Sequence, residues 1–395
     1  MAPTAETQAP LTPNKGKFLR GVADINEASL ARLSLREKKE KITPYEFEHL
    51  SPAYPDIHWE PLKELEYTDK ALGADEEYKE LFKAVTSYRH VTPKFGTVLE
   101  GVNLAELNDK QKAELAHLTA YRGVIFFRDQ KDLDIHKQLD LGRFWGKLHK
   151  HATTALPRDW EKGLDEVHVV FANEYRPPSQ AYPQSYLWHS DVSYELQPPA
   201  YTTLKLLDGP EEAGGDTLWI SGYGLYDALS PGLKEYVEKH TALHSAHEQA
   251  DGARANGKTV RRDPIVTEHP LVRVHPVTGY KSLYVNPGFT RSIVGVPKAE
   301  SDAILQYLFS LIATSQEYTA RFTWGKHDLA LWDNRVTVHS ATYGFYPNRR
   351  HAVRVTVHGE TPYYDPNGKS QQEEIDAQLQ RKTYIDGSKG INYND

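Results

Sequence analysis

The feature that most constrains the fold is a series of short strand patterns in the second half of the chain. In Ala352–His358 the residues Val353, Val355 and Val357 alternate with polar residues. Because side chains along a strand point alternately to two faces, this pattern predicts a strand with one apolar face. Further short strands are expected at Tyr201–Leu207, Thr217–Ile220, Ser282–Val285 and Leu329–Trp332.

Helical patterns lie among these strands. Apolar residues recur at helical spacing in Asn108–Arg122, Asp132–Leu148, Ser221–Lys239 and Lys298–Ser315, and the run Gly123–Phe127 is typical of a buried strand. No internal repeat is present. Short strands with helices grouped around them predict an α+β protein with a barrel-like or double-sheet β core.

The two ends of the chain differ from this patterned body. Residues 1–85 are polar and rich in Pro and Tyr, which predicts an N-terminal extension with a helix near Ala28–Lys41. Residues 86–364 form the expected folded domain. Residues 365–395 are again polar and are expected to form a tail or a homo-oligomer contact.

Charge and hydropathy exclude several classes of partner. The formal net charge is −7 and no Lys/Arg block stands out, so we expect no nucleic-acid partner. No apolar run is long enough to cross a bilayer, and the first residues lack the apolar core of a signal peptide. We therefore expect a soluble, cytoplasmic protein without a membrane partner.

The chain contains no cysteine, and Met1 is its only methionine. Disulfides, zinc–thiolate sites, iron–sulfur clusters and cysteine nucleophiles are therefore excluded. The lack of sulfur has two explanations that the sequence leaves open. One is general composition bias. The other is selection against sulfur, which would suit an enzyme that handles oxidants or one made during sulfur shortage.

A candidate metal site begins at Trp188-His189-Ser190-Asp191. In an extended segment residues two apart share a face, so His189 and Asp191 can present a nitrogen and an oxygen to one ion. Such a pair alone is more often an ordinary hydrogen bond. Two histidines and one carboxylate are the ligand set of non-haem Fe(II) oxygenases, which requires a distal histidine. Spacing alone does not choose among these candidates: His244, His247, His269, His275, His339, His351 and His358.

Further motifs follow in a fixed order. They are Gly214–Thr217 (GGDT), Trp332–His339 (WDNRVTVH), the pair Arg349-Arg350, and Arg354. Together with Trp188–Asp191 they resemble the taurine dioxygenase family, which includes the 2,4-dichlorophenoxyacetate dioxygenases and fungal sulfonate dioxygenases. The resemblance covers residues 95–362.

This resemblance implies a fold, cofactors and site residues. The implied fold is a double-stranded β-helix, or jelly-roll, with flanking helices. The implied metal is Fe(II), held by His189, Asp191 and His339, with 2-oxoglutarate and O₂ as cosubstrates. Arg350 and Thr217 match the residues that hold 2-oxoglutarate, whereas Arg349 would face the other side of the strand as a surface charge.

The resemblance also implies which residues bind the substrate. Arg354 lies four residues beyond Arg350, on the same strand face and roughly 13 Å away, and with His151 it would bind an anionic head group. His149 offers a competing alignment for His151. The residues Val192, Tyr194 and Phe289 match the family's pocket walls, although core packing is the alternative for each.

The sequence departs from the bacterial taurine dioxygenases at two positions. Those enzymes have a Tyr and an Asn at these positions, and both help to recognise the amine of taurine. This chain has Thr154 and Ser185 instead, so the resemblance does not extend to that end of taurine.

The resemblance implies a dioxygenase that converts an alkyl sulfonate to an aldehyde and sulfite, with succinate and CO₂ as further products. One alternative is the same chemistry on a carboxylate such as an amino acid, by hydroxylation, desaturation or cyclisation. A more remote alternative is a non-catalytic ligand-binding jelly-roll.

Overall fold

A computed structural model describes residues 45–173, 184–210, 214–345 and 348–379. By its internal packing the chain divides into two units, Met1–Glu46 and Phe47–Asp395. Almost all described residues belong to the second unit, and the description below concerns that unit. The helix expected near Ala28–Lys41 lies outside the described residues.

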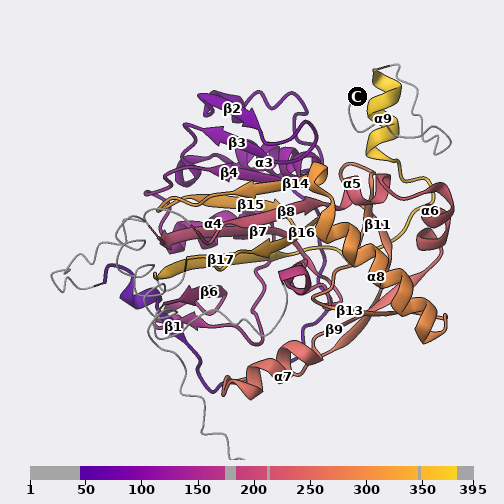
Figure 1. The fold of residues 1–395 in the computed structure, drawn as a ribbon. Coiled ribbons are helices and arrows are strands. Elements are labelled where there is room, and N and C mark those ends of the chain that lie inside the picture. The colour runs from indigo at the N-terminus through magenta and orange to yellow at the C-terminus, as the bar shows by residue number, and fades with distance from the viewer. Residues whose placement is uncertain (1–44, 174–183, 211–213, 346–347, 380–395) are drawn as a thin grey trace, which may run out of the picture. The chain divides into compact units, whose positions relative to one another are not determined.

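The largest sheet has seven strands in the order β2-β3-β4-β15-β7-β17-β6 (Figure 1). All neighbours are antiparallel except β3 and β4. The bounds are β2 Ser87–His90, β3 Thr97–Glu100, β4 Val124–Phe127, β6 Val167–Ala172, β7 Pro199–Asp208, β15 Leu329–Asp333 and β17 Arg350–His358. The strands expected at Gly123–Phe127, Tyr201–Leu207, Leu329–Trp332 and Ala352–His358 are thus all present.

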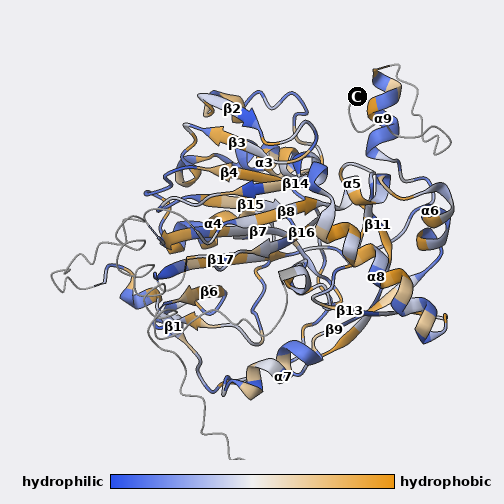
Figure 2. Ribbon diagram, in the orientation of Figure 1, coloured by the Kyte–Doolittle hydropathy of each residue, from blue (hydrophilic) through white to orange (hydrophobic). Residues whose placement is uncertain are grey.

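Helices α3 (Asp109–Arg122) and α4 (Ile135–Trp145) pack with one face of this sheet. Leu115 of α3, Leu139 of α4 and Val355 of β17 belong to one buried apolar cluster. Helix α3 begins where the sequence predicts, because the Asn108 side chain accepts from the backbone of Gln111 and the Gln111 side chain accepts from that of Asn108. Both helices and β4, which is hydrophobic along its length (Figure 2), agree with the expectation from the sequence.

A three-stranded sheet, β14-β8-β16, packs with the opposite face. Its strands are β8 Thr217–Ser221, β14 Thr319–Phe322 and β16 Thr337–Ala341. Phe126 of β4 stacks on Phe322 with 4.3 Å between ring centroids and meets Trp219 of β8 edge-on at 5.3 Å. Aromatic and aliphatic side chains therefore fill the space between the two sheets, and the core has a helix–sheet–sheet layering.

The remaining elements surround this core. The other helices are α5 Gly222–Asp227, α6 Pro231–Glu238, α7 His247–Ala255, α8 Lys298–Thr314 and α9 Gln371–Gln378, and the smaller sheets are β10-β9-β13 (Val266–Pro270, Thr241–Ser245, Thr290–Ile293), β11-β12 (Val272–Val274, Lys281–Leu283) and β1-β5 (Pro52–Ala53, Leu156–Pro157). The helical pattern Ser221–Lys239 is two helices, because Ser230 caps a new helix whose first residue is Pro231. Among the described helices none is long and apolar enough to cross a membrane.

The segment before residue 86 contacts the core directly. Leu50, Ala71 and Leu81 are buried in the same apolar cluster as α3 and α4. Strand β1 of this segment pairs with β5. The boundary at residue 85 stays a prediction, and the described part of the extension packs against the domain that follows it.

Candidate active site

His189 and His339 lie side by side although 150 positions separate them in the sequence. They form an isolated antiparallel bridge, in which His189 N donates to His339 O at 2.9 Å and His339 N donates to His189 O at 2.8 Å. Their ring centroids are 4.2 Å apart. Strand β16 therefore brings to His189 the one distal histidine that the resemblance had selected.

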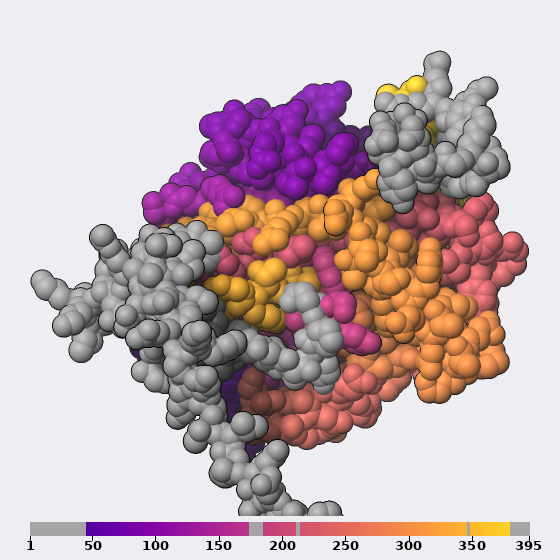
Figure 3. All heavy atoms as spheres, viewed as in Figure 1, coloured from indigo at the N-terminus to yellow at the C-terminus, as the bar shows by residue number. Residues whose placement is uncertain are grey.

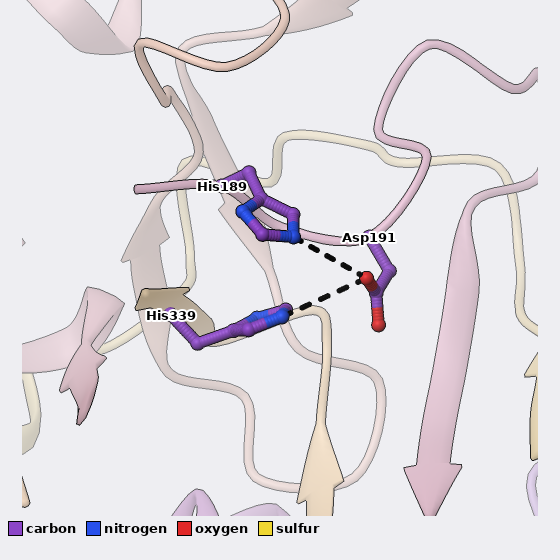
Figure 4. A group of neighbouring side chains, drawn as sticks. All are labelled: His189, Asp191 and His339. Atoms are coloured by element: carbon purple, nitrogen blue, oxygen red, sulfur yellow. Dashed lines mark ion pairs between the residues drawn. The ribbon is translucent and has the colours of Figure 1, made fainter. Parts of the chain in front are cut away.

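Asp191 completes a group of three (Figure 4). Its Oδ1 lies 3.7 Å from Nε2 of His189 and 3.7 Å from Nε2 of His339. One ligand atom from each residue falls within 4.8 Å of the others. Directly after Asp191 the backbone leaves the extended conformation, since Val192 has a φ of +40°, which is unusual for a β-branched residue.

The chemistry of these atoms fits a divalent metal. His189 Nδ1 donates to the carbonyl of Leu187 at 2.8 Å, which leaves the Nε2 lone pair of the neutral ring free. Both ring nitrogens of His339 and Oδ2 of Asp191 are buried without a hydrogen-bond partner among the described residues. Burial lowers the pKa of both histidines, so the rings stay neutral, as metal ligands must be.

Asn334 of the Trp332–His339 motif holds the Asp191 backbone from both sides. Its Oδ1 accepts from Asp191 N at 2.7 Å, and its Nδ2 donates to Asp191 O at 3.0 Å. Ser190 is tied to the same region, because its hydroxyl donates to the carbonyl of Thr337 at 2.7 Å. The sequence reasoning used this motif only as a family mark and missed its positioning role.

A buried ionic cluster lies next to Asn334 in the chain. Arg335 is fully buried and binds Asp333 through Nη2 at 2.6 Å and Asp69, of the N-terminal segment, through Nη1 at 2.6 Å. His275 adds a contact of 2.9 Å to Asp333. Although burial opposes it, the Arg335 and His275 charges hold the pKa of Asp333 well below its usual range. The cluster anchors the turn from which Asn334 reaches Asp191.

Arg350 opens strand β17 and is a buried cation that forms no ion pair with any carboxylate of the described residues. Its Nη2 has no partner among the described residues, and its guanidinium lies 5.9 Å from the ring centroid of Trp324. Asp216, an acid whose charge acts on Arg350, binds Arg321 at 2.7 Å. Burial lowers the pKa of Arg350 to about 10. A site of this kind favours an incoming anion.

Thr217 and Gly215 lie on the same side of the site as Arg350. The Thr217 hydroxyl accepts from Trp324 Nε1 at 3.0 Å, so its own proton can be donated elsewhere. Gly215 has a φ of +71°, and a Cβ there would lie 2.9 Å from Cδ of Arg350. Gly215 of the GGDT motif therefore makes room for the arginine.

A cavity of about 540 Å³ joins these groups. Nine of the ten residues singled out from the sequence line it: His151, His189, Asp191, Val192, Thr217, Phe289, His339, Arg350 and Arg354. Tyr194 does not. It packs behind Phe289, with ring centroids 5.0 Å apart, and its hydroxyl donates to Gln249 Oε1 at 2.8 Å. Figure 3 shows a face on which gold atoms from the C-terminal part of the chain lie beside magenta atoms from its middle part.

Arg354 is partly engaged in the structure. Its Nη1 forms an ion pair with Oδ1 of Asp191, its guanidinium lies 5.7 Å from the ring centroid of Trp332, and its Nε has no partner among the described residues. The resemblance implied contact with a substrate and not this contact with a ligand residue. A metal ion on Asp191 would compete for the same carboxylate and make Arg354 available.

The structure distinguishes His151 from His149, the two histidines that could each match the family's substrate-binding histidine. His151 lines the cavity, whereas His149 does not and instead pairs with Glu195 at 3.1 Å. Burial, followed by the neighbouring His168, lowers the pKa of His151 well below its usual value. Its Nδ1 accepts from Thr153 N at 3.2 Å, which places the proton of the neutral ring on Nε2.

Two histidines and one carboxylate around one point are the ligand set of non-haem metal sites of the oxygenase type. The model of the taurine catabolism dioxygenase TauD, TfdA family matches residues 87–356. The chain therefore belongs to this family of dioxygenases.

The similar proteins agree with that membership. A putative alpha-ketoglutarate-dependent sulfonate dioxygenase of Schizosaccharomyces pombe is 44% identical over 333 residues, which is 84% of each chain. An alpha-ketoglutarate-dependent sulfonate dioxygenase of Saccharomyces cerevisiae is 36% identical over 88% of this chain and 85% of its own. A solved structure of a putative alpha-ketoglutarate-dependent taurine dioxygenase from Burkholderia xenovorans has a TM-score of 0.60 at 30% identity, covering 72% of this chain and 96% of its own.

Proposed function

We propose that this dioxygenase uses Fe(II), 2-oxoglutarate and O₂ to oxidise an alkyl sulfonate to an aldehyde and sulfite. The observation that carries the proposal is the placement of Arg350 and Arg354 in one cavity with the His189, Asp191 and His339 group. Two cations beside a metal site match two anions, namely the far carboxylate of 2-oxoglutarate and the sulfonate. The names of the two fungal relatives support the choice of substrate class.

The three ligand residues would hold Fe(II) through Nε2 of each histidine and one carboxylate oxygen of Asp191. The orphaned buried nitrogens of His339 and the orphaned Oδ2 support this assignment. Bound iron, with 2-oxoglutarate and O₂, would supply the oxidising power that removes hydrogen from a substrate carbon. The protein would keep Asp191 in place through the two Asn334 hydrogen bonds.

Arg350 would bind the far carboxylate of 2-oxoglutarate with its planar guanidinium, and the Thr217 hydroxyl would donate to the same group. Both residues line the cavity. Trp324, which donates to Thr217 and lies 5.9 Å from Arg350, would keep both donors in place and exclude water from this end.

Arg354 and His151 would bind the substrate's anionic head group, with Arg354 donating from its guanidinium and His151 from Nε2. Val192 and Phe289 line the cavity and would contact the apolar part of the substrate. Tyr194 would act indirectly, by holding the ring of Phe289 in place. The overall reaction balances as alkyl sulfonate, 2-oxoglutarate and O₂ giving aldehyde, sulfite, succinate and CO₂.

We also propose that the two facing sheets form the family's double-stranded β-helix, or jelly-roll. The packing of Phe126 against Phe322 and Trp219 supports this. The domain is proposed to cover residues 86–364, between an extension of residues 1–85 and a tail of residues 365–395. The family match to residues 87–356 supports these limits.

A substrate panel tests the function. Purified protein with Fe(II), 2-oxoglutarate and ascorbate is offered linear alkyl sulfonates, taurine, amino acids and aryloxy acids, and succinate and sulfite are measured. We expect sulfite and succinate in equal amounts from a sulfonate. An amino or aryloxy acid consumed without sulfite from any sulfonate would refute the sulfonate assignment. Arg349, which pairs with Asp208 on the surface, provides a control variant, Arg349→Gln.

A further inference from the structure

His168 lies directly across from Arg354 in the large sheet. Strand β6 pairs with β17 in the register that places Arg354 opposite His168 and Val355 opposite Val167. Val167 is buried in the cluster on the helix side of the sheet. The neighbouring His168 therefore points to the other face, and it lines the cavity together with Arg354 and His151.

Neither ring nitrogen of His168 has a hydrogen-bond partner among the described residues. Its ring centroid lies 5.2 Å from that of His151. Burial, followed by the charge of Arg354, lowers the pKa of His168 well below its usual value. The ring is then neutral and carries one N–H donor. A donor that lines a cavity and has no protein partner is suited to a ligand atom.

Three different donors thus meet in one corner of the site. His151, His168 and Arg354 also line a small recess of about 10 Å³ that adjoins Asp191. The other carboxylate of this recess, Glu166, is neutralised by Arg143 at 2.9 Å. Asp191, the remaining carboxylate of the recess, pairs with Arg354 and is a proposed metal ligand. The corner therefore offers two imidazole donors and one guanidinium to an anion.

We propose that His168 is a specificity-determining residue that donates a hydrogen bond to the third oxygen of a tetrahedral anionic head group. The inference rests on the proposed substrate site at Arg354. A sulfonate or a sulfate ester presents three oxygens, one for each donor. A carboxylate presents only two oxygens, whose lone pairs lie in one plane, so one of three donors arranged around a tetrahedral group lacks a well-aligned acceptor. His168 therefore selects sulfur oxyanions over carboxylates.

Calorimetric binding to protein loaded with Mn(II) and 2-oxoglutarate, in which no turnover occurs, tests this proposal. The probes are propanesulfonate, propyl sulfate and butanoate. We expect the unaltered protein to prefer the sulfur oxyanions by about tenfold or more, since the unmet donor costs about one factor of ten. Unequal affinities for propanesulfonate and propyl sulfate identify which of the two is the better ligand.

Two variants separate the hydrogen bond from packing. His168→Phe keeps a ring but removes the donor, and should abolish the preference by weakening the sulfur oxyanions alone. His168→Gln restores an N–H donor and should recover part of the preference. This second variant also keeps the test valid if the Phe variant does not fold. The surface change His136→Gln on α4 is the control. A preference unchanged in both His168 variants would overturn the proposal.

The outcome is independent of the turnover assay. If no sulfonate yields sulfite but His168→Phe still loses the preference for sulfur oxyanions, the proposed reaction is wrong and the head-group site stands. If sulfite is produced but the preference does not depend on His168, the reaction stands and this inference fails.

Discussion

The side chain of Asn334 binds the backbone of Asp191, accepting from Asp191 N at 2.7 Å and donating to Asp191 O at 3.0 Å. These bonds join residues 143 positions apart. They tie Asp191, the carboxylate of the candidate metal site, to the turn between β15 and β16. The geometry of the proposed metal site would therefore depend on a residue that is not itself one of the three proposed ligands.

Replacing Asn334 by Ala should weaken metal binding while leaving the three ligands in place. Loss of such a supporting residue typically costs about 10- to 100-fold in metal affinity. Titration with Mn(II) or Co(II), followed by spectroscopy, measures the change. Asn367→Ala, at an exposed turn, is the control. An affinity equal to that of the unaltered protein would show that Asp191 does not need Asn334.

Asp69→Asn should destabilise the fold, because it leaves the buried Arg335 with one carboxylate fewer. Breaking a buried ion pair by removing one partner costs about 3–5 kcal/mol. Chemical denaturation measures the free energy of unfolding. The exposed Glu77, changed to Gln, is a control from the same segment. Equal stability of Asp69→Asn and Glu77→Gln would mean that the N-terminal segment does not support the site.

Arg350→Gln should raise the KM for 2-oxoglutarate by at least about tenfold, since hydrogen bonds to charged groups contribute ~1.5–3 kcal/mol. Its effect on the KM of the sulfonate should be small, because Arg354 and His151 are the residues proposed to hold that ligand. Steady-state succinate formation gives both constants. Arg349→Gln should change neither. A larger effect on the sulfonate than on 2-oxoglutarate would reverse the assignment of the two arginines.

Acid should destabilise the metal-free protein below about pH 6.5, the ordinary pKa of histidine. Burial lowers the pKa of His244 and His339 well below that value. The unfolded chain therefore binds more protons than the folded chain, so stability is full above pH 6.5 and falls as the pH drops. Denaturation of chelator-treated protein between about pH 5 and 7.5 should show a slope of roughly 1.4 kcal/mol per pH unit for each such group. A flat profile would contradict this.

Local sequence patterns predicted the core helices and strands because capping and side-chain alternation depend on residues that are close in the sequence. The Asn108 and Gln111 pair marks the start of α3, and the alternation of Val353 and Val355 marks the buried face of β17. Helix α7 escaped notice because its sequence, HEQADGARA, has few apolar residues. The break at Pro231 was missed for a different reason, namely that the apolar spacing continues through it.

The candidate site was predictable only in part. His189 and Asp191 are two residues apart, so local geometry could nominate them, whereas His339 needed the family resemblance. His168 and Asn334 could not be found from spacing, because strand register places His168 at the cavity and a loop contact across the chain places Asn334 at Asp191. Tyr194 shows the opposite case, since a position that matches the family's pocket wall lies behind Phe289.

The most direct test is a crystal structure grown without O₂ in the presence of Fe(II), 2-oxoglutarate and an alkyl sulfonate, with iron located by anomalous scattering. The account predicts one iron among His189, Asp191 and His339, 2-oxoglutarate with its far carboxylate on Arg350, and the sulfonate on Arg354. Iron bound elsewhere, or 2-oxoglutarate held by Arg354, would contradict it.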